Sequence, residues 1–522
     1  MVHRFLIRFT ERSALAAAVA FLATAETAAA ELKPRFKTAV AFDVSPPLRV
    51  MAPAAPRGKP PAQELIEIRR ERGEPAPDRG FSGDGAVQAP VRALAPSLAI
   101  APPSLTFEGL SNLDNFNAFG FRVNPPDPNG EVGPNHYVEM VNLVYAVYSK
   151  SGALLLGPVD TGTLWSGFPI EDCTDPSGDP IVLYDQLEDR WLLSQFTTRG
   201  MNPNGSFNGL PFYNCVAISV TGDPTGAYFR YAFITTIDID DVDVVFFPDY
   251  PKYGVWKKTY VLTSRDFGIN GEYGISVYAL EKNKMIAGDP SARAVHFFID
   301  GNNPTLLPLV GDGLLPADID GTRQPKDDAA IPIVGTQDDG ARYGATFDAV
   351  NIWDLKIHWQ TDPVASLVLN TQLPVAAFDS IFPCGVAAGL PPPNQPTGRD
   401  CLPQPGVNGS QYLDVLSYRQ RPTWRLAYRN FKDYESMVTN QSVESSPGVA
   451  GIRWYEIRRV GNTYSIHQQG TYAPPDGINR WMGSIAQDKN GNMALGYSVV
   501  NGTNVFPGTV TPAGSRATPP GR

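Results

Sequence analysis

The sequence predicts an all-β protein, a β-propeller of about six or seven blades that is preceded by a disordered segment rich in proline and alanine. Glycine (48) and proline (49) are abundant, and so are phenylalanine (26) and tyrosine (21). Many turn formers with many aromatic residues are typical of short strands joined by turns. A hairpin pattern also recurs along the chain, and this repetition predicts the propeller.

Each hairpin unit has an aromatic-ended strand, a polar turn and a second apolar strand. The pattern occurs at 148–156, 184–193, 353–359, 454–464 and 487–495. A hairpin repeated over a long all-β chain is the pattern of radial repetition. Roughly 400 residues with a repeat of about 40 to 60 residues give the predicted six or seven blades.

The first thirty residues have the pattern of a signal peptide. Three arginines within the first twelve residues precede an apolar run at 15–23 and the small residues 28–30. A membrane anchor needs about 20 apolar residues, and polar residues interrupt this run from Thr24 onward. We expect export, with cleavage near Ala30 and a secreted or periplasmic mature chain that has no membrane span.

The segment 31–104 differs in composition from the rest of the chain. Thirteen of its 74 residues are proline and few are aromatic, so we expect an extended or disordered linker. Residues 63–72 are the exception: they form either an amphipathic docking helix or a marginal helix within the linker. A propeller domain is expected at 105–508. The tail 509–522 has no strand pattern, which suggests the hypothesis that the chain ends early.

Strands are predicted in order along the domain, with one short helix. The helix is expected at 282–287, ended by Gly288. The strands are expected at 136–142, 143–148, 180–184, 191–196, 215–220, 228–233, 253–256, 260–263, 274–279 and 330–334, and they continue to residue 498.

The chain has four cysteines, and an even number in an exported protein predicts two disulfides. Four cysteines allow three connectivities; sequential pairing, Cys173 with Cys215 and Cys384 with Cys401, is the simplest. The chain has no C-x-x-C motif, and its histidines show no ligand spacing. Structural disulfides are therefore favoured over a metal site.

Four segments resemble a known family. They are 124–137, 178–185 (Gly-Asp-Pro-Ile-Val-Leu-Tyr-Asp), 249–256 (Asp-Tyr-Pro-Lys-Tyr-Gly-Val-Trp) and 480–488. They are similar to segments of exported bacterial proteins of uncharacterised function with a predicted β-propeller domain. The resemblance covers roughly residues 105–508 and implies the fold and export, without implying a chemistry. Residues after Phe506 depart from it.

The acidic charge of the chain argues against nucleic acid as a partner, and closely spaced aspartates suggest calcium as a cofactor. With a formal charge of −10, the chain has no general basic signature for nucleic acid. Asp238, Asp240 and Asp249 fall at the first, third and twelfth positions of a calcium-type loop, but Asp243 replaces the required glycine. A solvated acidic loop is the alternative to calcium. Asp127 with its neighbours up to Glu131 is a second candidate, against a proline-rich turn.

Candidate catalytic groups are carboxylates, since no nucleophile motif is present. Asp249 and Glu456 are the expected pair, one as acid and one as nucleophile or base, about 5 to 10 Å apart across the channel. Asp185, Asp354 and Asp488 are interpreted as turn formers. Arginines that could grip an acidic substrate, or could simply lie on strand exteriors, are Arg419, Arg421, Arg425, Arg429, Arg453 and Arg480.

The preferred function is a binding or scaffolding module at the cell exterior, with an unknown glycan or protein ligand. Trp256, Trp353 and Trp481 could stack on sugars, or pack between blades. The alternative is a glycan-active hydrolase or lyase of sialidase-like propeller architecture. A third hypothesis is an interaction module that uses one rim. Fold alone does not decide among them.

Overall fold

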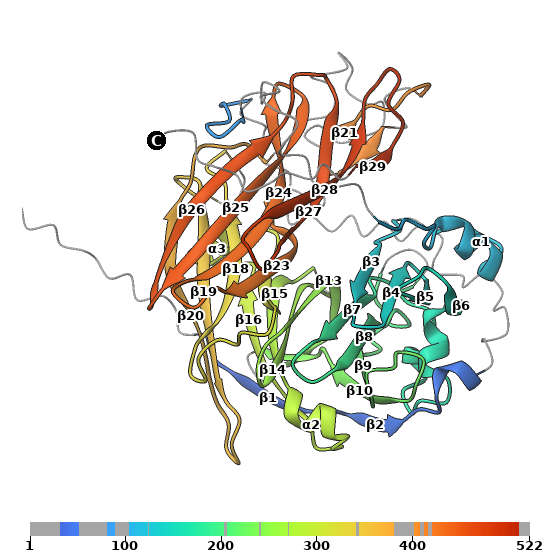
Figure 1. Ribbon diagram of the computed structural model, residues 1–522. Helices are drawn as coiled ribbons and strands as arrows, with labels where there is room; N and C mark the ends of the chain where they lie inside the picture. The colour runs from blue at the N-terminus through green and yellow to red at the C-terminus, as the bar shows by residue number, and fades with distance from the viewer. Residues whose placement is uncertain are drawn as a thin grey trace, which may run out of the picture. The chain divides into compact units, whose positions relative to one another are not determined.

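The chain folds into successive antiparallel meanders, in which strands that are consecutive in sequence are neighbours in the sheet (Figure 1). The computed structural model describes residues 32–51, 81–88, 104–123, 125–202, 206–239, 242–269, 271–340, 344–380, 401–407, 412–415 and 420–510. Strand accounts for 51% and helix for 7%, which confirms the all-β prediction.

Six meanders succeed one another in the described residues. The first contains β3 (Asn129–Val132), β4 (His136–Val141), β5 (Val144–Ser149) and β6 (Leu154–Asp160). The second contains β7 (Ile181–Asp185), β8 (Arg190–Phe196), β9 (Tyr213–Ser219) and β10 (Tyr228–Ile234). The third contains β13 (Phe246–Val255), β14 (Thr259–Gly268), β15 (Tyr273–Glu281) and β16 (Arg293–Asp300).

The later meanders have the same pattern. The fourth contains β17 (Leu315–Asp320), β18 (Ile331–Gln337), β19 (Ala349–His358) and β20 (Val364–Pro374). The fifth contains β23 (Thr423–Asn430), β24 (Glu435–Ser446), β25 (Val449–Val460) and β26 (Thr463–Tyr472). The sixth contains β27 (Asn479–Gln487), β28 (Met493–Val500) and β29 (Gly508–Val510). Residues 509 and 510, the start of the tail expected to have no strand pattern, pair with β28.

The first strands of the meanders are successive neighbours, in the order β3, β7, β13, β17, β23 and β27. The strands β17 and β23 pair in parallel, which joins the fourth and fifth meanders into one eight-stranded sheet. This is a β-propeller arrangement, in which four blades are recognised. The count of six or seven blades stays a prediction.

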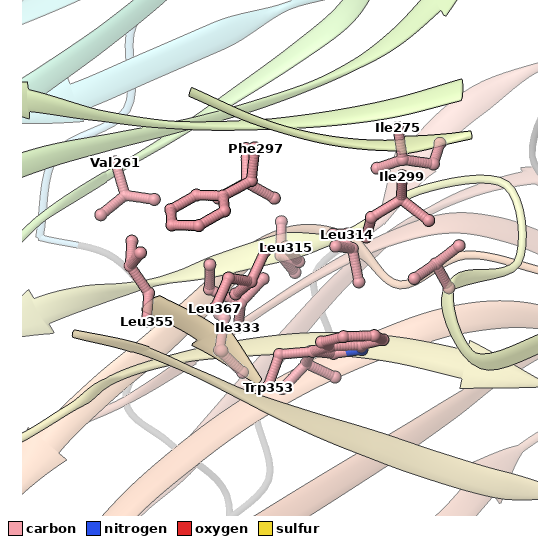
Figure 2. Packing of buried hydrophobic residues seen from close by; sticks show 14 of the residues in the cluster. Val261, Ile275, Phe297, Ile299, Leu314, Leu315, Ile333, Trp353, Leu355 and Leu367 are labelled. Atoms are coloured by element: carbon pink, nitrogen blue, oxygen red, sulfur yellow. The ribbon is translucent and has the colours of Figure 1, made fainter. Parts of the chain in front are cut away.

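Successive meanders pack face to face, because both faces of their strands are apolar. In β15, Ile275 and Val277 belong to a core shared with the fourth meander, whereas Tyr278 and Leu280 belong to a core shared with the second. Side chains alternate between the faces of a strand. Figure 2 shows the first of these cores, where residues from β14 to β16 face Trp353 and its neighbours from β17 to β20.

The N-terminal segment is not wholly disordered, which corrects the expectation for residues 31–104. β1 (Arg35–Thr38) pairs with β16, and β2 (Ala41–Val44) pairs with β10, so each adds a fifth strand to a meander. The prolines that dominate this segment are absent from residues 35–45, so this stretch can donate every ladder hydrogen bond. Asp43 accepts two hydrogen bonds from Arg230, at 2.7 and 2.6 Å.

Residues 84–87 of the same segment are also bound to the propeller. Val87 forms a parallel bridge with Thr471, and the fully buried carboxylate of Asp84 pairs with Arg453 at 2.6 Å. The predicted signal peptide, the expected helix at 63–72 and residues 511–522 lie outside the described residues.

Three α-helices interrupt the strands of the described chain. α1 (Asn112–Phe119) begins at a capping box formed by Ser111 and Asp114, and α2 (Lys282–Ala287) has the predicted bounds, with Gly288 at its end. The third, α3 (Leu307–Val310), is one turn long. None of the helices in the described part is long and apolar enough to cross a membrane.

Short pieces complete the described structure. The 3₁₀-helices are η1 (Leu48–Val50), η3 (Thr161–Trp165) and η4 (Glu171–Thr174). Two small ribbons are formed by β11 (Ile237–Ile239) with β12 (Val242–Val244) and by β21 (Cys401–Leu402) with β22 (Leu413–Asp414).

The first predicted disulfide is present, between Cys173 and Cys215, and closes a loop with a sequence separation of 42. The second predicted bridge falls outside the described residues at Cys384, and the side chain of Cys401 is not described. Sequential pairing is therefore confirmed for one bridge.

Removing this bridge is expected to destabilise the protein. In the chain-entropy treatment, a loop of this length contributes about 4 kcal/mol at 25 °C. The double substitution of Cys173→Ser and Cys215→Ser should lower the free energy of unfolding by up to about that amount, as measured by denaturant titration. An unfolding midpoint equal to that of the oxidised wild type would contradict the expectation.

Candidate active site

Left-handed backbone marks the start of most first strands. Non-glycine residues with positive φ stand just before β3, just before β7, within β13 and shortly before β23: they are Asp127 (37°), Asp179 (48°), Tyr250 (54°) and Gln420 (53°). This backbone costs on the order of 1 kcal/mol per residue, and such residues cluster at functional sites. Since the first strands are neighbours, residues near their starting ends lie close together, and a site is expected there.

Asp127 and Asp179 form a hydrogen-bonded carboxyl pair at this end, and both side chains are half-buried. Burial, and then the neighbouring charge of Asp127, raise the pKa of Asp179 to about 8. Two adjacent carboxyls cannot both ionise without repulsion, so the pair holds one proton at neutral pH.

Asp249 extends the pair into a cluster. It lies where a β-bulge shifts the register of β13, and the backbone N–H of the next residue, Tyr250, donates to Asp179 Oδ2 at 3.0 Å. Burial raises the pKa of Asp249 to about 6, with a further rise from the charge of Asp179 and opposition from Arg265. Arg265 Nη1 lies 4.0 Å from Asp249 Oδ2.

Buried cations lie beside these carboxyls. Lys252 Nζ lies 3.5 Å from the centre of the Tyr250 ring, and the guanidinium carbon of Arg421 lies 3.5 Å from the same centre. Lys252 is 9% exposed and Arg421 is 2% exposed. Arg421 was expected to grip a substrate or to lie on a strand exterior; it is instead buried against Tyr250. We name Asp127, Asp179, Asp249, Lys252 and Arg265 the carboxyl cluster.

A second charged group lies further along the first strands. Arg425 Nε donates to Asp318 Oδ2 at 2.7 Å, and a second nitrogen of Arg425 bonds to Asp320. Burial raises the pKa of Asp318 to about 7, and Arg425 opposes this rise. Burial also raises the pKa of Glu131 on β3, which Arg425 again opposes.

The expected partner of Asp249 is elsewhere. Glu456 lies on β25, where it accepts hydrogen bonds from Ser436 at 3.0 Å, Arg458 at 2.7 Å and Gln468 at 2.5 Å. Burial alone would raise the pKa of Glu456, but these bonds hold it below its usual value. Within the described part of the chain, no contact links Glu456 to Asp249.

Of the two alternatives for the three tryptophans, stacking on sugars or packing between blades, the structure shows them in packing contacts. Trp256 is 4% exposed and meets Tyr428 edge-on at 4.9 Å, and Trp353 is 1% exposed. Trp481 is half-buried against the core that contains Leu402. Large rings fill the space between stacked sheets, so the favourable burial of these rings leaves little surface for a ligand.

The expected calcium ligands do not converge among the described residues. Asp238 is exposed on β11, Asp240 lies outside the described residues, and Asp249 belongs to the carboxyl cluster. The acidic group with ligand atoms within 4.8 Å of one another is Asp338, Asp339 and Asp348. Its two buried carboxylates already accept backbone N–H bonds, and calcium stays a prediction.

A cavity of about 440 Å³ lies away from the carboxyl cluster, on the first meander. Its walls include Leu105, Phe107, Tyr137, Glu139 and Lys150. Burial raises the pKa of Glu139, whose Oε2 accepts the backbone N–H of Leu110 at 2.8 Å.

Asp179 does not stand out as a site residue in the sequence, and Asp127 was expected there only as a calcium ligand. The available signal was a residue before proline, which recurs at Asp127-Pro128, Asp179-Pro180 and Tyr250-Pro251. These dipeptides lie within three of the segments that carry the family resemblance.

Comparison with known proteins gives neither a family nor a curated relative. No family model matches the chain. No curated protein matches it either.

Solved structures with partial likeness were found. An endo-arabinase from Bacteroides thetaiotaomicron has 12% identity and a TM-score of 0.25, covering 65% of this chain and 93% of its own. A point mutant of Cellvibrio cellulosa alpha-L-arabinanase has 9% identity and a TM-score of 0.28, covering 74% and 90%. An exo-beta-1,3-galactanase from Clostridium thermocellum has 9% identity and a TM-score of 0.32, covering 74% of each chain. Likenesses this low carry no argument about the chemistry of the site.

Proposed function

We propose that this protein is a glycan-active hydrolase whose catalytic groups are Asp179 and Asp249. The observation that supports the proposal is the carboxyl cluster, whose aspartates lie just before β3, just before β7 and at the bulge of β13. One of its carboxyls has a pKa of about 8 and another a pKa of about 6. Two carboxyls of different pKa are what acid-assisted cleavage of a glycosidic bond requires.

In this mechanism Asp179 is the general acid and Asp249 is the general base. Asp179 is protonated at neutral pH and donates its proton to the glycosidic oxygen as the bond to the anomeric carbon breaks. Asp249 is ionised and accepts a proton from the water that attacks this carbon, and it returns that proton to solvent once the products leave. Asp127 keeps the proton on Asp179 until transfer, since its own charge opposes ionisation of its neighbour. Asp179 is reprotonated from solvent after the products leave.

Arg265 and Lys252 favour the ionised form of Asp249. Both act to lower the pKa of Asp249 against the effect of burial. Without these cations, Asp249 would remain protonated near neutral pH and could not act as a base. The cluster thus contains an acid, Asp179, and two cations that favour the ionised form of the second carboxyl, Asp249.

We further propose that the protein works outside the cytoplasm, as the N-terminal sequence predicts. The Cys173–Cys215 bridge supports this, because disulfides persist in oxidising compartments.

Incubation with a glycan panel separates the enzyme from the binding module preferred on sequence alone. The panel holds neutral arabino-, galacto-, xylo- and gluco-oligosaccharides and one polyuronate, at pH 7. New reducing ends support the hydrolase. Retention of a glycan on the immobilised protein without new reducing ends would reject it in favour of the binding module. If a panel glycan is cleaved with formation of an unsaturated product, the reaction is that of a lyase and the proposal is wrong.

A further inference from the structure

We propose that Asn142 is a positioning residue that holds Asp127 and Asp179 together as one proton-sharing pair. The inference rests on the proposed function for its catalytic consequence, and on the structure for the pairing itself. Asn142 lies between β4 and β5, so it belongs to neither of the strand starts that it connects.

The Asn142 carboxamide bonds to both strand starts. Its Nδ2 donates to Asp127 Oδ2 at 3.2 Å and to the carbonyl oxygen of Pro125 at 3.1 Å. Its Oδ1 accepts the backbone N–H of Asp179 at 2.9 Å. Its own backbone N–H donates to the carbonyl oxygen of Pro126 at 2.8 Å. One side chain that is 4% exposed thus fixes two left-handed aspartates from different meanders.

Helix α1 supports Asn142 through a second asparagine. Asn115 Nδ2 donates to the carbonyl oxygen of Asn142 at 2.5 Å, and Asn115 Oδ1 accepts the backbone N–H of Leu143 at 2.6 Å. Asn115 is fully buried, whereas Leu113 and Phe116 of the same helix are about half exposed. A helix that buries its asparagine and exposes its apolar residues breaks the usual pattern, which is expected where a site is being supported.

The hydrogen bonds of Asn142 affect the protonation of Asp179. The Nδ2 of Asn142 donates to the Asp127 carboxyl and holds it beside Asp179, where the charge of Asp127 raises the pKa of Asp179. The other charged groups near the pair include Lys252, which lowers the pKa of Asp179, and Asp249, whose own pKa is raised by Asp179. Asn142 therefore acts on catalysis through Asp127 and Asp179.

The test is the substitution Asn142→Ala, with Asn129→Ala as its matched control. Asn129 is also a buried asparagine that connects the first two meanders, since its Oδ1 accepts the Val182 N–H at 2.7 Å, but it has no described bond to a carboxyl of the cluster. The readout is the carboxyl titration of Asp179, followed by carbon-13 NMR of aspartate-labelled full-length protein and assigned by its absence from Asp179→Asn.

We expect Asn142→Ala to move the Asp179 midpoint down by about one pH unit, and Asn129→Ala to leave it in place. On a cleaved glycan, Asn142→Ala should lower kcat about 2-fold at pH 7 and ~10-fold at pH 9, with little change in KM, because less Asp179 is then protonated. Equal Asp179 midpoints in the two variants would overturn the inference. If Asn142→Ala does not fold, Asn115→Ala replaces it, with a downward shift of the same midpoint expected and no shift overturning the inference. The titration needs no turnover, so a shifted midpoint with no cleaved glycan rejects the hydrolase alone.

Discussion

The substitution Asp179→Asn is expected to lower kcat/KM for glycan cleavage by ~10²- to 10⁴-fold, the range typical of a lost general acid. An asparagine side chain preserves the shape of the residue and can still accept the Tyr250 N–H, but it has no acidic proton to transfer. Initial rates of reducing-end release at pH 7 measure the effect. A variant with more than a tenth of wild-type activity would contradict the assignment of Asp179 as the acid.

The same variant has a stability signature that serves as its folding control. The pKa of Asp179 is raised to about 8 in the folded protein, against about 4 in an unfolded chain. Its contribution to stability is therefore complete below about pH 4 and is lost as the pH rises through about 8. Asp179→Asn should remove this part of the pH dependence, so its unfolding free energy should fall less than that of the wild type between pH 5 and pH 8.

Asp189→Asn is the matched control for activity. Asp189 also has a positive φ, 53°, but it is exposed in the turn between β7 and β8 and accepts a hydrogen bond from Tyr184 at 2.7 Å. We expect its kcat/KM to stay within about 2-fold of the wild type, because it lies outside the carboxyl cluster. An equal loss in both variants would point to general damage.

The second large effect is expected from Asp185→Ala, which should lower the free energy of unfolding by about 3 to 5 kcal/mol. Asp185 and Lys282 are both fully buried, with Lys282 Nζ 2.6 Å from Asp185 Oδ2. Tyr260 also donates to this carboxylate, at 2.9 Å. Among the described residues, truncation leaves the buried ammonium with only Glu188, 3.8 Å away, as an ion-pair partner.

Denaturant titration measures this loss, and Asp327→Ala is its control. Asp327 pairs with Lys257, but its side chain is 82% exposed. Exposed ion pairs contribute little, typically under about 1 kcal/mol. Equal unfolding midpoints for the two variants would contradict the account of the buried pair. If burial decides the energy, Asp185→Ala should unfold at a clearly lower denaturant concentration.

Local features of the fold could be predicted from the sequence because they depend on neighbouring residues. The helix α2 and its glycine stop are determined by residues 282–288, and each predicted strand falls in or overlaps a strand of the structure. The turn-forming interpretation of Asp185 and Asp488 is confirmed, since each accepts a backbone N–H bond from the residue two positions onward. Such bonds close within a few residues and leave a signature in composition. The interpretation is wrong for Asp354, which lies within β19 and accepts hydrogen bonds from the side chains of Asn370 and Tyr464.

Features that depend on distant partners could not be predicted in this way. β1 pairs with β16 and β2 with β10, about 260 and about 190 residues later in the chain, and the proline-rich surroundings concealed these pairings. The three aspartates of the carboxyl cluster come from three meanders and meet only because the first strands are neighbours. Glu456 was a candidate because arginines lie near it in the sequence. In the structure Arg458 does donate to Glu456, but both residues lie on β25 and not on a first strand.

The most direct test of the two-carboxyl mechanism is the pH dependence of kcat/KM for the glycan that is cleaved fastest. Activity needs Asp249 ionised and Asp179 protonated. The profile should therefore rise through about pH 6 and fall through about pH 8, with its maximum near pH 7. A profile that lacks the fall near pH 8, or that has its maximum below pH 5, would contradict the assignment of these two carboxyls.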